Sequence, residues 1–173
     1  MPVLTNPARL QIQKNMTAVL QGITIANGYA TDIGTDVYRG RIVYGDEAPV
    51  PMLSILEVPI PLDQDQPAAP TGLSKGPWEL MVQGWVKDDR ENPTDPAHFL
   101  MADVKKCLAL ERKRGHDWNA PEDGIFGLGR IITDMYIGAG VVRPPEEISA
   151  KAYFWLTVTL DLAENLEDPY TDE

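Results

Sequence analysis

Cysteine is almost absent from this sequence, and long apolar runs are absent altogether. The 173 residues contain a single cysteine, Cys107, which excludes an internal disulfide framework and fits a reducing compartment. No run reaches the roughly 18 apolar residues that a membrane-spanning helix needs. The opening residues, MPVLTNPARLQ, hold no apolar stretch typical of a signal peptide. We therefore expect a protein that is made in the cytoplasm and has no membrane partner.

Basic residues are also scarce. Fifteen lysines and arginines stand against 26 aspartates and glutamates, so the formal net charge is −11. Since most nucleic-acid affinity comes from neutralising phosphates, a chain this acidic is not expected to bind DNA or RNA specifically. The densest basic group comprises Lys105, Lys106, Arg112, Lys113 and Arg114, and its helical spacing favours the solvated face of a helix.

Residue types that carry chemistry are few and scattered. The only two histidines, His98 and His116, have no second histidine or cysteine at metal-ligand spacing. Cys107 has no C-x-x-C partner, and no serine lies in a G-x-S-x-G motif. Gly127-Leu128-Gly129 lacks the third glycine of a dinucleotide-binding fingerprint. We therefore expect no catalytic residue, no metal site and no cofactor.

Two helices are predicted from apolar residues that recur every three or four positions. The first opens at Asn6-Pro7, with Asn6 as the expected N-cap and Pro7 at the first helical position, and it ends near Gly22. The second begins at Thr94-Asp95-Pro96 and includes the basic group, whose cations suit a helix C-terminus. The expected buried stripes are Ile12, Met16, Val19, Leu20 and Ile23 in the first helix, and Ala97, Leu100, Met101, Val104 and Leu108 in the second.

Strand-forming segments fill much of the remaining chain. The stretch ANGYATDIGTDVYRGR has a turn signal at Asn27-Gly28, and we expect extended pieces on either side of Gly34. The predicted strands are 29–33, 36–44, 52–58, 78–88 and 130–142, the last of which breaks at Gly138-Ala139-Gly140.

The most regular strand lies near the end of the sequence, in KAYFWLTVTLDLAE. Its even-numbered residues from Phe154 to Leu162 are apolar, which predicts a face packed on a core. Its other face carries Tyr153, Trp155, Thr157, Thr159 and Asp161. Because β-branched and aromatic residues predominate there over charged ones, we expect a second layer or another subunit to cover it. Residues 164–173 form an acidic tail that we expect to fray.

A long loop is predicted from Pro59 to Pro77. This stretch has five prolines, two glycines and no periodicity, and a structureless segment of such length in a compact domain is usually functional or disordered. We expect it to be an arm used between subunits or against a partner protein. With the outer side of the last strand, it supplies the candidate interface residues: Leu62, Asp63, Gln64, Asp65, Leu73, Lys75, Tyr153, Trp155 and Thr157.

The order of these elements favours one α+β domain that spans residues 1–173. A helix is followed by several strands, a second helix and two more strands. Hairpin signals and short connections favour a mainly antiparallel sheet with both helices packed on one face. The sequence has no internal repeat and no sign of a domain boundary.

Five segments, taken in order, resemble the small tail-terminator (tail-completion, or minor tail) proteins of long-tailed bacteriophages, the functional class of the lambda tail terminator. The segments are GITIANGYATDIGTDVYRGR, PMLSILEVP, WELMVQGWV, NPTDPAHFLMADVKKCL and LTVTLDLAENLEDPY. The resemblance spans Asn6 to Tyr170 and depends on the order and spacing of the segments, since no single motif is diagnostic. Gln64 to Lys75 and Gly115 to Asp123 do not match, so the resemblance says nothing about interfaces there.

The resemblance implies a structural virion protein. Such proteins form a ring, commonly a hexamer, at the head-proximal end of the tail tube, where they stop tube polymerisation and join the tail to the head. The implied partners are other copies of the chain, the tail tube protein and the head-completion or connector proteins. DNA passes through such a ring without specific binding, and a negative wall would not retain it. Two alternatives stay open: a head-completion or neck protein of the same joint, and a small enzyme or ligand-binding domain.

Overall fold

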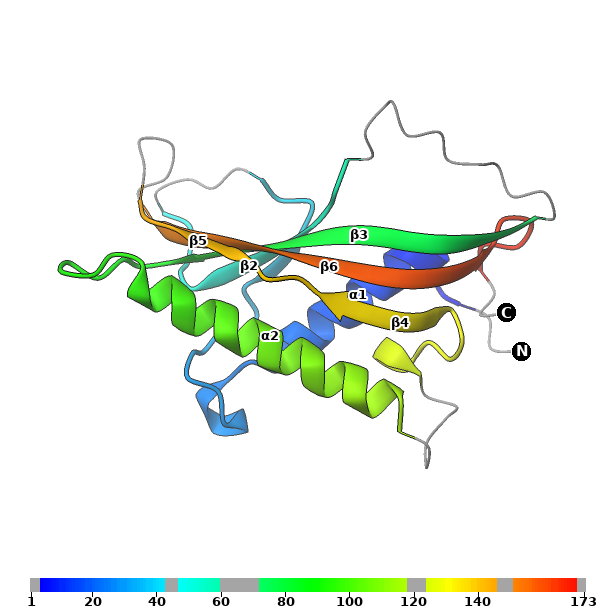
Figure 1. Ribbon diagram of the computed structural model, residues 1–173, viewed down its shortest axis with the longest axis horizontal. Coiled ribbons are helices and arrows are strands. Elements are labelled where there is room, and N and C mark those ends of the chain that lie inside the picture. Colours follow the sequence, from blue (N-terminus) through cyan, green and yellow to red (C-terminus); the bar gives the residue numbers. More distant parts are fainter. Residues whose placement is uncertain (1–3, 43–46, 60–71, 118–123, 146–150, 171–173) are drawn as a thin grey trace.

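Figure 1 shows the computed structural model of the chain. The structure describes residues 4–42, 47–59, 72–117, 124–145 and 151–170. Its helices and strands, in chain order, are α1 (Ala8–Gln21), the short 3-10 helix η1 (Ile25–Asn27), β1 (Val37–Arg39), β2 (Met52–Glu57), β3 (Leu73–Val86), α2 (Asp95–Gly115), the short 3-10 helix η2 (Ile125–Gly127), β4 (Ile132–Ile137), β5 (Val141–Arg143) and β6 (Ala152–Asn165).

The described strands form one mixed sheet. Its order is β1-β2-β3-β6-β4, and β5 pairs with β6 as well. β1 and β2 run parallel, whereas all the other neighbours are antiparallel. The centre is a ribbon of two 14-residue strands, β3 and β6, in unbroken register from Leu73 opposite Asn165 to Val86 opposite Ala152. The predicted single α+β domain with a mainly antiparallel sheet is therefore confirmed.

Both helices lie on the same side of the sheet (Figure 1). α1 begins at Ala8, one residue later than predicted, because Pro7 and not Asn6 is its N-cap and no side chain caps the helix. α2 has Pro96 in its first turn. The last turn of α2 carries Arg112–Arg114, where cations complement the negative end of the helix dipole. The predicted buried stripes are confirmed except at Val19 and Met101, which are only half-buried.

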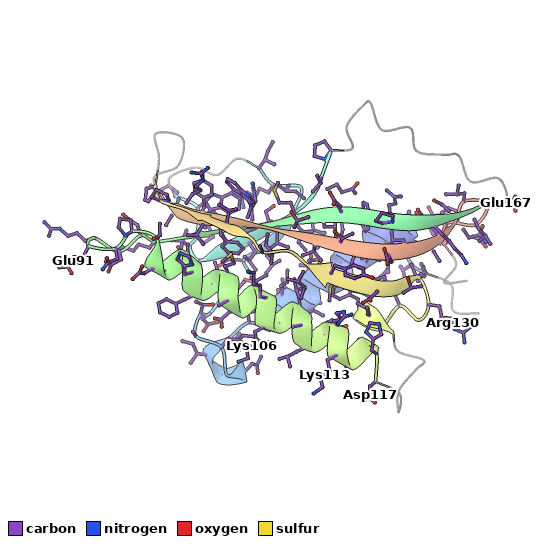
Figure 2. All side chains as sticks on the ribbon, in the orientation of Figure 1. Glu91, Lys106, Lys113, Asp117, Arg130 and Glu167 are labelled. Atoms are coloured by element: carbon purple, nitrogen blue, oxygen red, sulfur yellow. The ribbon has the colours of Figure 1, made fainter. Side chains whose placement is uncertain are left out.

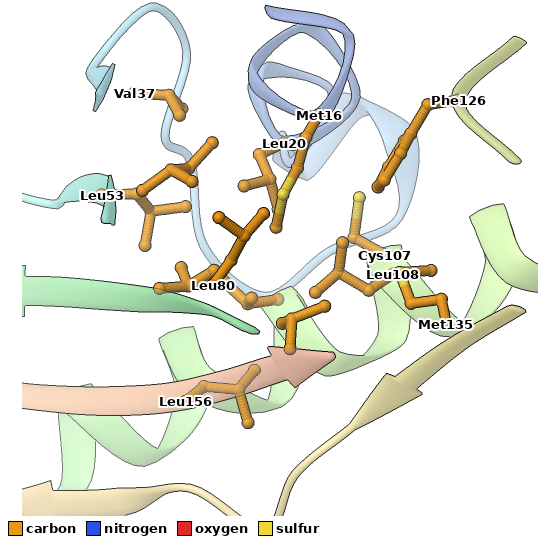
Figure 3. Close-up of a cluster of buried hydrophobic side chains, with 14 of the residues drawn as sticks. Met16, Leu20, Val37, Leu53, Leu80, Cys107, Leu108, Phe126, Met135 and Leu156 are labelled. Atoms are coloured by element: carbon orange, nitrogen blue, oxygen red, sulfur yellow. The ribbon is translucent and has the colours of Figure 1, made fainter. Parts of the chain in front are cut away.

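The core lies between the helices and the sheet (Figure 3). The even-numbered residues of β6 from Phe154 to Leu162 are buried in it, whereas the odd-numbered residues from 153 to 161 are half-buried on the other face. The predicted alternation of β6 is therefore confirmed. Met16 and Leu20 of α1 meet Leu80 of β3 near the centre of this core.

A glycine makes room for the largest of these side chains. Gly84 of β3 lies opposite Phe154 of β6. A Cβ atom at Gly84 would lie 2.2 Å from the Phe154 ring and 3.0 Å from a methyl carbon of Leu53. The ring therefore occupies the space that any side chain at position 84 would need, which is one of the few reasons for glycine inside a strand.

The stretch 26–41 forms less sheet than the sequence predicts. Only Val37–Arg39 is a strand, and the strand predicted at 29–33 is wrong. The reason is a polar contact with α2, where Asp103 accepts hydrogen bonds from both the backbone N–H and the hydroxyl of Thr31, each at 2.7 Å. These bonds hold the segment against the helix, so it has no sheet neighbour. Residues 43 and 44 of the other predicted strand lie outside the described residues.

The loop predicted from Pro59 to Pro77 is also partly wrong, because β3 begins at Leu73. Residues 73–77 pair with β6. A proline fits at position 77 because β2 ends at Glu57, opposite Leu80, so this part of β3 has β6 as its sole described neighbour and one unpaired side. Residues 60–71 of the predicted loop lie outside the described residues.

The acidic tail does not fray over its described part, contrary to the prediction. Residues 164–165 belong to β6. The backbone N–H of Leu166 donates to the carbonyl of Gly72 at 2.7 Å, and the N–H of Leu4 donates to the carbonyl of Tyr170 at 2.7 Å. These bonds tie the segment to the start of β3 and to the residues that precede α1. Residues 171–173 lie outside the described residues.

Candidate interaction surface

One face of the β3–β6 ribbon points away from both helices. We call it the outer face and define it by the odd-numbered residues 75–85 of β3 and 153–161 of β6. Three candidate interface residues, Tyr153, Trp155 and Thr157, lie on it and are half-buried. No described helix or strand lies over this face (Figure 1). The cross-strand partners of the three residues are Trp85, Gln83 and Met81.

Aromatic rings dominate one end of the outer face. The ring centroids of Tyr153 and Trp155 are 5.8 Å apart, and the guanidinium of Arg143 in β5 lies 5.7 Å from the centroid of the Trp155 ring. Trp85, opposite Tyr153, is only 7% exposed. Because these rings support one another, they form a rigid apolar surface, and such anchors carry much of the energy of protein interfaces.

Carboxylates gather further along the same face. Glu79 and Asp161 flank Thr159, which lies opposite Glu79 and beside Tyr136 of β4. The charges of Asp134 and Asp161 raise the pKa of the Tyr136 hydroxyl, and Asp134 contributes most. The outer face thus changes from aromatic to acidic along the ribbon.

An ion pair fixes one of these carboxylates. The Arg112 guanidinium of α2 donates hydrogen bonds of 2.8 and 3.2 Å to the two carboxylate oxygens of Asp134. These bonds hold the pKa of the Asp134 carboxyl below its usual value. Asp134 therefore stays ionised under ordinary conditions, although its charge is largely balanced by Arg112.

The remaining candidate residues do not join the aromatic end. Leu73 and Lys75 are exposed and lie on the same side of the ribbon as Tyr153, but at its opposite end. Fourteen-residue strands place these ends roughly 40 Å apart, at about 3.3 Å per residue. Residues 62–65, which hold the other four candidates, lie outside the described residues.

The helix layer contains two buried carboxylates that the sequence analysis missed. The first is Asp103, which binds Thr31 as described above. Close to it, partial burial and a hydrogen bond to Cys107 raise the pKa of Tyr29 to about 12, and burial raises the pKa of the Cys107 thiol. Lys106 donates to the carbonyl of Gly28 at 2.7 Å. This group of residues attaches the 24–36 segment to α2.

The second buried carboxylate is Glu111. It accepts hydrogen bonds from the backbone N–H of Phe126 at 2.6 Å and from the guanidinium of Arg114 at 2.6 and 2.9 Å. The amide of Asn15 in α1 donates to the carbonyl of Phe126 at 2.9 Å. Phe126 has a left-handed backbone, with φ of 57°, and these bonds hold it there. Asp103 and Glu111 both lie at positions that the helical spacing of α2 predicts to be buried. This spacing could have identified them as buried acids from the sequence.

Other features of the described residues offer little for chemistry. No three His, Cys, Asp or Glu side chains in the described ranges come together so that they could hold a metal ion. A depression of about 510 Å³ beside the start of α2 has walls that include Val86, Pro96 and Phe99. Asp32 and Lys87 are the charged residues in its walls. Nδ1 of His116 is 2.8 Å from the carbonyl oxygen of Arg112, and His98 is exposed on α2.

Comparison with known proteins adds no relative. No protein-family model matches the chain, and no curated protein matches it. Within the described residues, neither helix combines the length and the apolar character needed to cross a bilayer. The functional assignment therefore depends on the order of the sequence segments and on the surfaces described above.

Proposed function

We propose that this chain is a structural virion protein of a long-tailed bacteriophage. It forms a ring, expected to be a hexamer, at the head-proximal end of the tail tube. The ring ends tube polymerisation and joins the tail to the head connector. Its partners are further copies of the chain, the tail tube protein and the head-completion or connector proteins. The protein is made in the host cytoplasm and is incorporated into the tail or neck.

The outer face is the observation that carries this proposal. A sheet that packs helices on one side normally presents polar and charged residues on the other. Here Tyr153, Trp155 and Thr157 occupy one end of that side, where the guanidinium of Arg143 lies over the tryptophan ring. The carboxylates Glu79 and Asp161 lie further along it. Tyrosine, tryptophan and arginine are the residues that most often dominate binding energy at protein interfaces. Such a surface supports a role in assembly.

Charge supports the same role. The chain carries a formal charge of −11, and an acidic wall around a DNA channel repels the passing phosphates instead of binding them.

The test is to add the purified protein to growing tail tubes made from the tube protein alone. The expected result by negative-stain electron microscopy is a ring at one end of each tube and an end to tube growth. Trp155→Ala should abolish the rings. A chain that binds the isolated head connector but ignores tube ends would be a neck protein. A chain that binds neither would contradict both assignments.

A further inference from the structure

The exposed side of α2 combines cations with apolar side chains. The exposed residues on this side of α2 recur every three or four positions along the sequence and therefore share one side of the helix. We call them the helix stripe. Phe99 is 61% exposed and Leu110 is 51% exposed, and Figure 2 shows Lys106 and Lys113 pointing away from the sheet. The stripe consists of Phe99, Ala102, Lys106, Ala109, Leu110 and Lys113, all of them exposed.

The helix stripe is basic although the protein is acidic. α2 contains five cations and three acids, a net charge of +2, so the remainder of the chain carries −13. Two of the three acids, Asp103 and Glu111, are buried. Between positions 98 and 113, every exposed charged side chain is therefore a cation. Within the stripe, Lys106 is held by the carbonyl of Gly28, whereas Lys113 has no partner among the described residues. A second copy of this chain is thus an electrostatically suitable partner for the stripe.

The outer face of a second copy fits the stripe in both chemistry and architecture. Met81 and Thr157 lie opposite each other in the middle of that face, and Glu79 and Asp161 supply carboxylates beside them. The apolar side chains of the stripe would lie against Met81 and Thr157 of the next copy. Lys113 would lie near the carboxylates of Glu79 and Asp161. A sheet face that carries outward-pointing aromatic residues is suited to a second layer, and a helix from a neighbouring copy would supply one.

The two surfaces lie on opposite layers of the molecule (Figure 1), so one copy can use both at the same time. A contact between unlike surfaces passes from copy to copy and closes into a ring when the rotation allows it. We propose that the helix stripe of each copy packs on the outer face of the next. This pairing rests on the proposed ring and specifies which surfaces form it.

The first test introduces acids into the helix stripe of the full chain. Leu110→Glu combined with Lys113→Glu keeps two good helix formers and places two negative charges opposite the carboxylates of the outer face. The apparent dissociation constant from sedimentation velocity should rise by more than about tenfold. The matched control is Leu10→Glu with Lys14→Glu, which makes the same change at exposed positions of α1 and should leave association unchanged.

The second test uses complementation. Glu79→Lys combined with Thr159→Lys makes the outer face basic at one cross-strand pair, and this variant alone should also fail to associate. An equimolar mixture of the two variants should associate again. In the mixture, each acidic stripe meets a basic outer face, and each unchanged stripe meets an unchanged outer face. Circular dichroism and thermal unfolding check that both variants are folded.

Several outcomes would overturn the pairing. They are wild-type association by either variant alone, a folded mixture that stays monomeric, and a wild-type chain that is monomeric at all concentrations. Loss of duplex DNA binding on Lys113→Glu would assign the stripe to nucleic acid instead. A monomeric chain that still caps tail tubes would overturn the pairing and leave the proposed function intact. A chain that associates through these surfaces but ignores tube ends would support the pairing and overturn the proposed function.

Discussion

The two faces of β6 share one backbone but differ in what they contact. Phe154, Leu156 and Val158 are fully buried against the helices. Tyr153 and Trp155, which alternate with them, are half-buried and have no described helix over them. In an antiparallel sheet with one solvated side, charged residues usually take the outward positions. The difference indicates that one face serves folding of the chain and that the other is suited to contact with a second molecule.

The largest expected effect comes from breaking the helix-covered face. Phe154→Ala should destabilise the protein by about 3–5 kcal/mol, because a fully buried ring is removed and Gly84 opposite leaves the cavity unfilled. Urea unfolding followed by circular dichroism measures the change. A loss below about 1 kcal/mol would mean that the ring is not packed in the core.

Overpacking the same point should have the next largest effect. Gly84→Ala places a methyl group 2.2 Å from the present position of the Phe154 ring, so the ring or the strand must shift. We expect a loss of about 1–3 kcal/mol. The double variant Gly84→Ala with Phe154→Leu should recover part of this loss, since the smaller side chain frees the space. Strict additivity of the two changes would argue against direct contact.

The buried carboxylate that holds the 24–36 segment is expected to matter somewhat less. Asp103→Ala leaves the N–H and hydroxyl of Thr31 without their acceptor, and we expect a loss of about 1–2 kcal/mol. Hydrogen exchange of the Thr31 amide should become faster while the amides of β6 stay protected. Uniform acceleration at both places would show that the segment does not open independently.

A substitution on the outer face should affect self-association strongly and monomer stability only slightly, in contrast to Phe154→Ala on the helix-covered face. Trp155→Ala should cost the monomer only about 1 kcal/mol, because the ring is half-exposed and its main described partners are Arg143 and Tyr153. Self-association measured by sedimentation should nevertheless be lost. A variant that unfolds like Phe154→Ala would show that the outer face also serves the core.

The smallest expected effect concerns the ion pair between Arg112 and Asp134. The pKa of Asp134 is lowered in the folded state, so its contribution to stability is present above the ordinary pKa and is lost as the pH falls through the folded value. Arg112→Gln should raise the pKa of Asp134 toward its ordinary value in a carboxyl NMR titration. The wild-type shift should shrink in high salt because the pair is partly exposed. An unchanged pKa in the variant would exclude Arg112 as the cause.

Local patterns in the sequence were enough to predict the helices and the alternation of β6. Apolar residues spaced every three or four positions determine one side of α1 and α2, and strict alternation determines the two faces of β6. Tyr153, Trp155 and Thr157 were placed together on an outward face by the same reasoning. These features depend on the backbone repeat of the helix or strand itself and not on which other segment packs or pairs with it.

Tertiary structure decided the features that depend on a distant partner. Residues 29–33 have strand-forming side chains, but Asp103 of α2 binds Thr31 and keeps the segment out of the sheet. Residues 73–77 look like a loop, but the long β6 supplies a neighbour for them, and β2 ends before Pro77. The sequence by itself therefore determined which side of each helix and strand is apolar. Only the tertiary structure decided which segments pair, because backbone hydrogen bonds go to whatever partner the fold brings within reach.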